Sequence, residues 1–177
     1  MNGLLALLLA GSPVMLPLPA RDARGATHTA AEVQQLTVFV FLATDCPICN
    51  RSIPDLNALA QRYQGKVRFF GVSSEKADAV AKHDDEYQLG FPTLLDPDLA
   101  FVKALGPTTT PTFVLVSPAR EVLYRGRFDD RIVDFGKERS KPRREDLRLA
   151  LDEALAGKPV SVPETPSIGC SIEGAHR

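Results

Sequence analysis

The stretch LTVFVFLATDCPIC, residues 36–49, decides the fold of this 177-residue chain. Residues 36–42 are rich in β-branched and aromatic side chains, are apolar on both faces and are too few for a globular helix, a pattern typical of a central strand. After Cys49, apolar residues recur at helical spacing until Gly65 ends the pattern. The pair Cys46 and Cys49 is therefore predicted to lie at a strand-to-helix junction.

Further elements follow outward from this junction in alternating order. They are a strand at 67–72, a helix at 76–89, a short helical turn at 99–105, and strands at 112–116 and 121–125. Strand, helix, strand, helix predicts a parallel βαβ unit, and the short turn between the last two strands predicts an antiparallel hairpin. The whole is predicted to be an α/β domain.

Three segments are expected along the chain: a signal peptide at 1–26, the domain at 27–157 and an irregular tail at 158–177 that carries Cys170. The domain is expected to end with a helix at 142–156. The residues assigned to that helix are Ser140 as its cap, Leu147, Leu151 and Leu155 as its buried stripe, and Gly157 as its stop.

The first residues resemble a leader sequence. Leu4–Ala10 is an apolar run, shorter than the ~20 residues that span a bilayer, and Ala20, Ala23 and Ala26 are candidate cleavage sites. Export to the periplasm or another extracytoplasmic compartment is the expectation. The alternative is an uncleaved segment that anchors the chain to a membrane, because Met1-Asn2-Gly3 carries no basic side chain.

Charge and composition exclude several classes of function. The net charge of −1 gives no basic surface for nucleic acid. The chain lacks a glycine-rich phosphate loop, so no nucleotide or flavin cofactor is expected and electrons must come from another protein. We also expect no metal, because the three histidines, His28, His83 and His176, have no ligand spacing and are predicted to lie on the surface.

The two cysteines can carry redox chemistry. Unpaired N–H groups and the partial positive charge at a helix N-terminus stabilise a thiolate, so Cys46 is the predicted nucleophile and Cys49 the resolving thiol. Haem attachment requires a histidine where this chain has Asn50. Zinc would need ligands from the distant tail, and a disulfide closing so small a loop would add little stability.

The order strand, Cys46-Pro47-Ile48-Cys49, helix, βαβ unit, and Thr110-Pro111-Thr112 before a hairpin resembles the thioredoxin superfamily over about residues 33–156. The resemblance implies a thioredoxin-like fold with a central mixed β-sheet flanked by helices. Within this superfamily, the chain resembles the redoxin branch more closely than the thioredoxins. This branch is the alkyl hydroperoxide reductase/thiol-specific antioxidant type, and it includes exported thiol-disulfide exchange proteins of cytochrome maturation. It further implies that Pro111 is cis beside the cysteines and that Thr110 offers its backbone to a substrate chain by strand addition.

Several residues depart from the family pattern. Asp45 replaces the tryptophan of thioredoxins and is expected to raise the pKa of Cys46, favouring reductant or isomerase-like chemistry. Peroxiredoxins place threonine three residues before the reactive cysteine, whereas Thr44 stands two before it. Arg125 or Arg127 is a candidate to supply the positive charge of a peroxide pocket, the alternative being solvated charges at a hairpin end.

Cys170 has three open interpretations: a thiol that resolves an oxidised Cys46, a bond to a partner protein, or an inert thiol. The carboxylate pairs Asp96/Asp98 and Asp129/Asp130 are interpreted as turn residues.

Three functions follow from these residues. The first is a thiol-disulfide oxidoreductase acting on protein thiols or disulfides with a protein electron donor. The second is a thiol peroxidase that reduces hydroperoxides, with Cys49 or Cys170 resolving. The third is a Cu(I)-binding assembly factor that uses the two thiolates.

Overall fold

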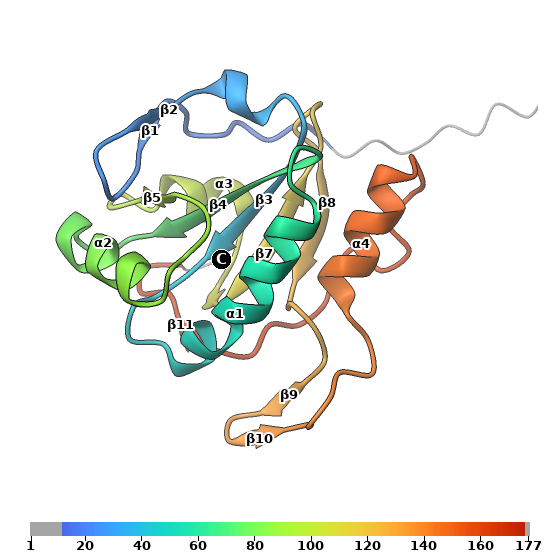
Figure 1. The fold of residues 1–177 in the computed structure, drawn as a ribbon. Coiled ribbons are helices and arrows are strands. Elements are labelled where there is room, and N and C mark those ends of the chain that lie inside the picture. The colour runs from blue at the N-terminus through green and yellow to red at the C-terminus, as the bar shows by residue number, and fades with distance from the viewer. Residues whose placement is uncertain (1–11, 176–177) are drawn as a thin grey trace, which may run out of the picture.

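A mixed five-stranded sheet forms the centre of the computed structural model, which describes residues 12–175. In the spatial order β5-β4-β3-β7-β8, its strands are Thr93–Leu95, Val67–Ser73, Leu36–Phe41, Thr112–Val116 and Val122–Gly126. β3 and β5 pair with β4 in parallel, whereas β7 pairs antiparallel with both β3 and β8. This is the predicted α/β arrangement with a central mixed sheet (Figure 1).

Helices cover both faces of the sheet. α1 (Pro47–Arg62) and α4 (Asp146–Leu155) pack on one face, and α3 (Ala100–Leu105) packs on the other with the N-terminal segment, while α2 (Ala77–Glu86) lies near the β5 edge (Figure 1). Side chains of a strand alternate between faces, so Val38 of β3 joins the α1 side and Phe39 the α3 side. Phe39 is fully buried, and its ring lies 5.6 Å from that of Phe101 between centroids.

Six very short strands and a 3-10 helix complete the fold. The strand pairs are β1 (Ala20–Arg21) with β2 (Thr27–His28), β9 (Ile132–Asp134) with β10 (Lys137–Glu138), and β6 (Thr109–Thr110) with β11 (Cys170–Ser171). The 3-10 helix is η1 (Ala30–Val33). β5 and these elements were not predicted, because two to four residues are too few to show a period.

Residues 14–26, which were assigned to the leader, are packed into the domain. Leu16 is buried, the Val14 N–H donates to Arg120 O at 2.8 Å, and the Ala23 N–H donates to Thr93 O at 2.9 Å. Cleavage at Ala26 would remove these contacts and β1. The boundary at 26/27 stays a prediction.

The apolar run Leu4–Ala10 lies outside the described residues, and the leader stays a prediction. Within residues 12–175, no helix is both long and apolar enough to cross a membrane.

The final helix differs from its prediction. α4 begins at Asp146, four residues later than expected, and Ser140 does not cap it. The preceding segment is instead held by Asp130, whose carboxylate accepts the backbone N–H groups of Arg143 at 2.7 Å and Arg144 at 3.0 Å. Leu147 and Leu151 are buried as predicted, whereas Leu155 at the last turn is 39% exposed.

The surface prediction was wrong for two histidines. His28 and His83 are both buried, while His176 lies outside the described residues. His28 lies between two carboxylates, with Nε2 at 3.0 Å from Asp22 and Nδ1 at 3.1 Å from Glu32. These ion pairs compensate for the burial of the ring, which residue type alone does not reveal.

The turn interpretation of Asp96 is consistent with the structure. Its buried carboxylate accepts the N–H groups of Phe101 and Val102, both at 3.0 Å, at the start of α3. The residue thus satisfies two of the donors that a helix N-terminus leaves unpaired.

Candidate functional site

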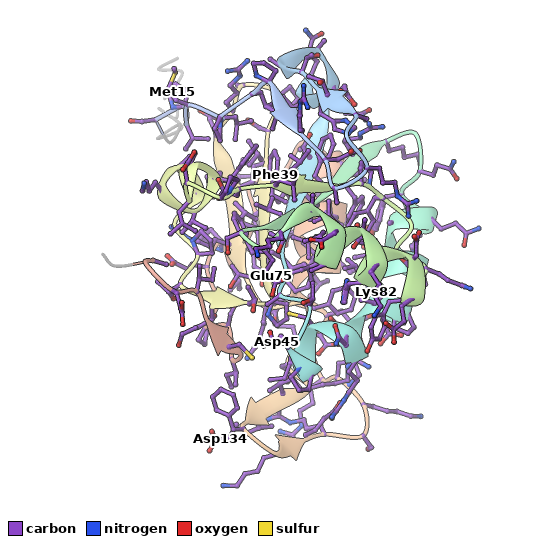
Figure 2. All side chains as sticks on the ribbon, turned by 90° about the vertical axis from the view of Figure 1, so that its left-hand side faces the viewer. Met15, Phe39, Asp45, Glu75, Lys82 and Asp134 are labelled. Carbon is purple, nitrogen blue, oxygen red and sulfur yellow. The ribbon has the colours of Figure 1, made fainter. Side chains whose placement is uncertain are left out.

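The cysteine pair lies where β3 ends and α1 begins. Cys46 is the N-cap of α1, Pro47 is its first residue, and Cys46 and Cys49 are both completely buried. Proline suits this position because its missing N–H would have no helical partner there. The neighbouring Asp45, marked in Figure 2 with Glu75, is exposed.

The surroundings of the two thiols shift their pKa values in opposite directions. Hydrogen bonding by the Cys49 thiol is the main cause that lowers the pKa of Cys46 to about 4, against the opposing effect of burial and with further help from Cys170. Burial, followed by the neighbouring Cys46, raises the pKa of Cys49 above its ordinary value. The pKa of Cys46 is thus lowered overall, because hydrogen bonds at the buried sulfur outweigh any opposing effect of the exposed Asp45 carboxylate.

The tail brings Cys170 to this site. Its thiol donates a hydrogen bond to Cys46 Sγ at 3.0 Å, although the residues are 124 positions apart. This hydrogen bond is the main reason why the pKa of Cys170 is raised to about 11, followed by burial. All three cysteines are free thiols.

The predicted substrate-binding residues adjoin the cysteines. The Thr110-Pro111 peptide bond is cis, as the resemblance implies, and Cys46 Sγ lies 3.4 Å from Thr110 O. Cys170 pairs with Thr110 across the β6/β11 ladder, and the Ile172 N–H donates to Thr108 O at 3.0 Å. The tail is thus not wholly irregular, because it forms a strand at the edge expected to receive a substrate.

Polar residues not singled out from the sequence hold the loop before Cys46. Glu75 accepts the Thr44 N–H at 3.0 Å and the Thr44 hydroxyl at 3.2 Å. Asn50 Nδ2 donates to Thr44 O at 3.1 Å, and its Oδ1 lies 2.8 Å from Nε2 of the buried His83. Glu75 follows β4, the parallel neighbour of β3. Because neighbouring parallel strands end at the same edge of a sheet, the position of Glu75 just after the second predicted strand could have placed it near Cys46.

The candidate arginines contact other groups. Arg125 donates to Leu105 O at 3.1 Å and lies 3.5 Å from Glu164. Arg127 pairs with Asp146 at 2.7 Å. Neither makes a hydrogen bond to Cys46. Arg127 lines the cavity that adjoins Ile48 and Pro111, where Asp146 neutralises its charge, whereas Arg125 is not part of that lining.

Among the described residues, no group of three or more histidine, cysteine, aspartate or glutamate side chains is arranged to hold a metal ion.

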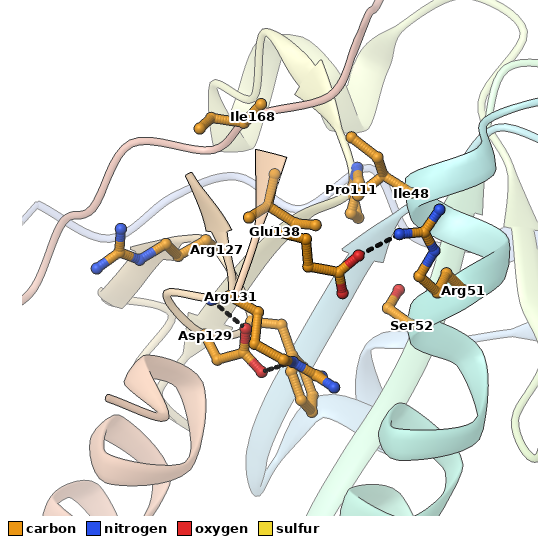
Figure 3. A pocket seen from close by; sticks show the side chains of 11 residues that line it. Ile48, Arg51, Ser52, Pro111, Arg127, Asp129, Arg131, Glu138 and Ile168 are labelled. Carbon is orange, nitrogen blue, oxygen red and sulfur yellow. Dashed lines mark hydrogen bonds and ion pairs between the residues drawn. The ribbon is translucent and has the colours of Figure 1, made fainter. Parts of the chain in front are cut away.

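A groove runs beside the cysteine pair. Its lining includes Ile48, between the cysteines, together with Pro111 and Ile168 (Figure 3). Ion pairs Arg51–Glu138 and Arg131–Asp129 stand along it, on α1 and on the segment around the β9/β10 hairpin. The site therefore combines the Cys46 sulfur, whose pKa is lowered, two further thiols and an adjoining cavity with apolar and charged walls.

The chain is similar to several known proteins. The thiol-disulfide oxidoreductase ResA of Halalkalibacterium halodurans is 28% identical over 126 residues, which cover 68% of this chain and 72% of that protein. A hypothetical protein from Sinorhizobium meliloti is 30% identical, with a TM-score of 0.80 and 93% of both chains covered.

A secreted disulfide oxidoreductase of Mycobacterium tuberculosis is 25% identical, with a TM-score of 0.53, covering 58% of this chain and 78% of that one. The thioredoxin-like fold is thereby confirmed. The model of the AhpC/TSA family matches residues 14–125. The chain belongs to the AhpC/TSA family, within the thioredoxin superfamily.

Proposed function

We propose that this protein is a thiol-disulfide oxidoreductase in which Cys46 is the nucleophile and Cys49 the resolving thiol. The observation that carries the proposal is the placement of Cys46 at the N-cap of α1, where the Cys170 thiol donates to its sulfur at 3.0 Å. In these surroundings, with hydrogen bonding by Cys49 as the main cause, the pKa of Cys46 is lowered to about 4, whereas that of Cys49 is raised. At neutral pH Cys46 is therefore a thiolate, and thiolates rather than thiols attack disulfides.

The reaction proceeds by two exchanges. The Cys46 thiolate attacks one sulfur of a substrate disulfide, forming a mixed disulfide and releasing the other substrate sulfur as a thiolate. Once Cys46 is bonded to substrate its negative charge is gone, which removes one cause of the raised pKa of Cys49. Cys49 then loses its proton and attacks Cys46 Sγ, so that the substrate leaves as a dithiol and the Cys46–Cys49 disulfide remains.

A protein dithiol is the proposed electron donor that restores the reduced pair, and protein disulfides are the proposed substrates. Action outside the cytoplasm is part of the same proposal, with residues preceding Val14 as the exporting segment. The Mycobacterium tuberculosis relative described as secreted supports it. Cell fractionation of the full chain and of a chain starting at residue 12 would test this location.

The test is a single turnover of reduced protein with a small aromatic disulfide. The natural protein is expected to release two thiols per molecule and to end with a Cys46–Cys49 disulfide. Cys49→Ser should release one thiol and keep the probe as a stable mixed disulfide on Cys46. Cys46→Ser should release none at a comparable rate.

Ser171→Ala is the matched control, because Ser171 is exposed and outside the cysteine pair. A mixed disulfide that forms on Cys49 or Cys170 in preference to Cys46 would overturn the assignment of the nucleophile.

A second function, reduction of hydroperoxides, is favoured by one contact. The Cys170 sulfur, 3.0 Å from Cys46 Sγ, is placed to condense with an oxidised Cys46. The thiolate would take the terminal oxygen of the peroxide, giving an alcohol and a sulfenic acid, and condensation with Cys170 would release water. Thr44 and the two arginines bond elsewhere, so this function ranks second. Peroxide consumption with dithiothreitol as reductant tests it.

Copper binding, the third function expected from the sequence, gains no support from the described side chains. The buried His83 is hydrogen-bonded through Nε2 to Asn50. Titration of reduced protein with Cu(I) in competition with a chelator would test it.

A further inference from the structure

The C-terminal strap, defined as residues 163–175, is fastened across the active site at both ends. At its start, the Arg125 N–H donates to Pro163 O at 2.9 Å and the Thr165 N–H donates to Arg125 O at 3.0 Å. The Thr165 hydroxyl also lies 2.7 Å from the hydroxyl of Tyr124. These contacts attach the strap to β8, an edge strand of the central sheet.

The middle of the strap lies against the edge beside Pro111. At Gly169 an added Cβ would stand 1.9 Å from Thr110 O and 3.2 Å from Pro111 Cδ, so only glycine permits this approach. The next residue, Cys170, pairs with Thr110, and Ile172 packs against the core cluster beneath α3. The docking is thus specified by backbone pairing, a steric requirement and apolar contact together.

This docking occupies the edge that the thioredoxin-like architecture offers to a substrate chain. Strand addition needs the backbone of Thr109 and Thr110, and β11 already uses both positions. Cys170 then stands where a substrate cysteine would stand, with its sulfur on Cys46. Under the strap, Cys46 is completely buried, whereas Cys170 is partly exposed.

We propose that the C-terminal strap is an intramolecular substrate that competes with polypeptide disulfides for the Thr109–Thr110 edge. This inference rests on the proposed function. While the strap is docked, it covers the Cys46 thiolate, and a polypeptide reaches the nucleophile only after the strap lifts. While the strap is docked, Cys170 is the one thiol that can exchange with Cys46. The substrates that displace the strap are extended polypeptide chains, which can replace β11 at the Thr109–Thr110 edge.

The internal exchange conserves electrons. In the oxidised protein, deprotonated Cys170 attacks Cys46 Sγ, the Cys46–Cys49 bond breaks, and the Cys46–Cys170 bond forms. The proton lost by Cys170 is taken up by Cys49, so one disulfide replaces another without an added oxidant or reductant. The product ties the strap covalently over the site and leaves Cys49 reduced.

The first test measures how fast iodoacetamide alkylates Cys46 in the reduced full chain at neutral pH. Gly169→Ala keeps all three cysteines but removes the space for docking, and Ile172→Asp loosens the strap by a different contact. Both are expected to raise the alkylation rate at Cys46 at least about tenfold, which corresponds to about 1.4 kcal/mol of docking free energy. Ser171→Ala, an exposed change in the same strand, should leave the rate unchanged.

The second test follows disulfides. Trypsin leaves Cys46 and Cys49 on one peptide and Cys170 on another, because cleavage follows Arg24, Arg51 and Arg148. Oxidised natural protein should give a cross-linked pair of these peptides, and Gly169→Ala should give much less. With a polypeptide disulfide such as insulin, Gly169→Ala should react faster than the natural chain.

The outcomes separate this inference from the proposed function. Equal alkylation rates in the natural chain, Gly169→Ala and Ile172→Asp would overturn the strap as a cover. Equal rates with insulin in all three would also overturn the competition while leaving the oxidoreductase intact. Alkylation that rises as expected, with no disulfide exchange by any variant, would keep the cover and reject the proposed function.

Discussion

Replacement of Cys170 by alanine should raise the pKa of Cys46. The Cys170 thiol donates to Cys46 Sγ at 3.0 Å, and this hydrogen bond favours the thiolate. A hydrogen bond to a charged group contributes about 1.5–3 kcal/mol, and one pKa unit corresponds to about 1.4 kcal/mol. Loss of the donor should therefore shift the pKa by about one to two units, from about 4 to roughly 5–6.

Thiolate absorbance in the ultraviolet, followed as the pH is raised, measures this shift. Cys46 can be assigned because the pKa of Cys49 is raised and that of Cys170 is about 11. Cys49→Ala should produce a larger shift than Cys170→Ala, since hydrogen bonding by Cys49 is the greater cause. Ser171→Ala serves as the control. A shift below about half a unit in Cys170→Ala, or the reverse order of the two variants, would refute the reasoning.

Three further predictions concern stability, each measured by urea unfolding. Leu147→Ala should lower the free energy of unfolding by about 2–5 kcal/mol because the side chain is fully buried. Leu155, at 39% exposure, is the control, and Leu155→Ala should change the free energy of unfolding by less than about 0.5 kcal/mol. Similar losses in the two variants would contradict the packing of α4. Asp96→Ala should cost about 1–3 kcal/mol because two helix N–H groups lose their acceptor, and an unchanged midpoint would speak against the cap. Burial lowers the pKa of His28, but its two carboxylate partners outweigh burial and raise it overall, so its stabilisation is complete below the unfolded value of about 6.5 and is lost as pH rises through the folded value. The free energy of unfolding of the natural protein should therefore fall between about pH 6 and pH 8, while that of His28→Gln should not. The same pH dependence in both proteins would show that His28 is not its cause.

Local signals predicted the central part of the fold. The run at 36–42, which is apolar on both faces, was predicted to be a strand and forms β3. The segment with helical spacing of apolar residues after Cys49 forms α1. The position of Cys46 ahead of a helix also followed from neighbouring residues. Boundaries without a periodic signal were less accurate: α4 starts later than expected because Asp130 binds the segment before it.

A strand, a cysteine pair and a helix, together with the thiolate-stabilising end of that helix, could be predicted from the sequence alone, because these features depend on residues within a few positions of one another. Tertiary structure was needed to place Cys170 against Cys46 and to fill the edge beside Pro111 with the tail. It also adds the Cys170 hydrogen bond to the causes that lower the pKa of Cys46. The contact of Cys46 with Cys170 joins residues 124 positions apart, and Cys170 pairs with Thr110 across 60 positions. These contacts depend on backbone pairing, burial and the space left by Gly169, which have no periodic pattern in the chain.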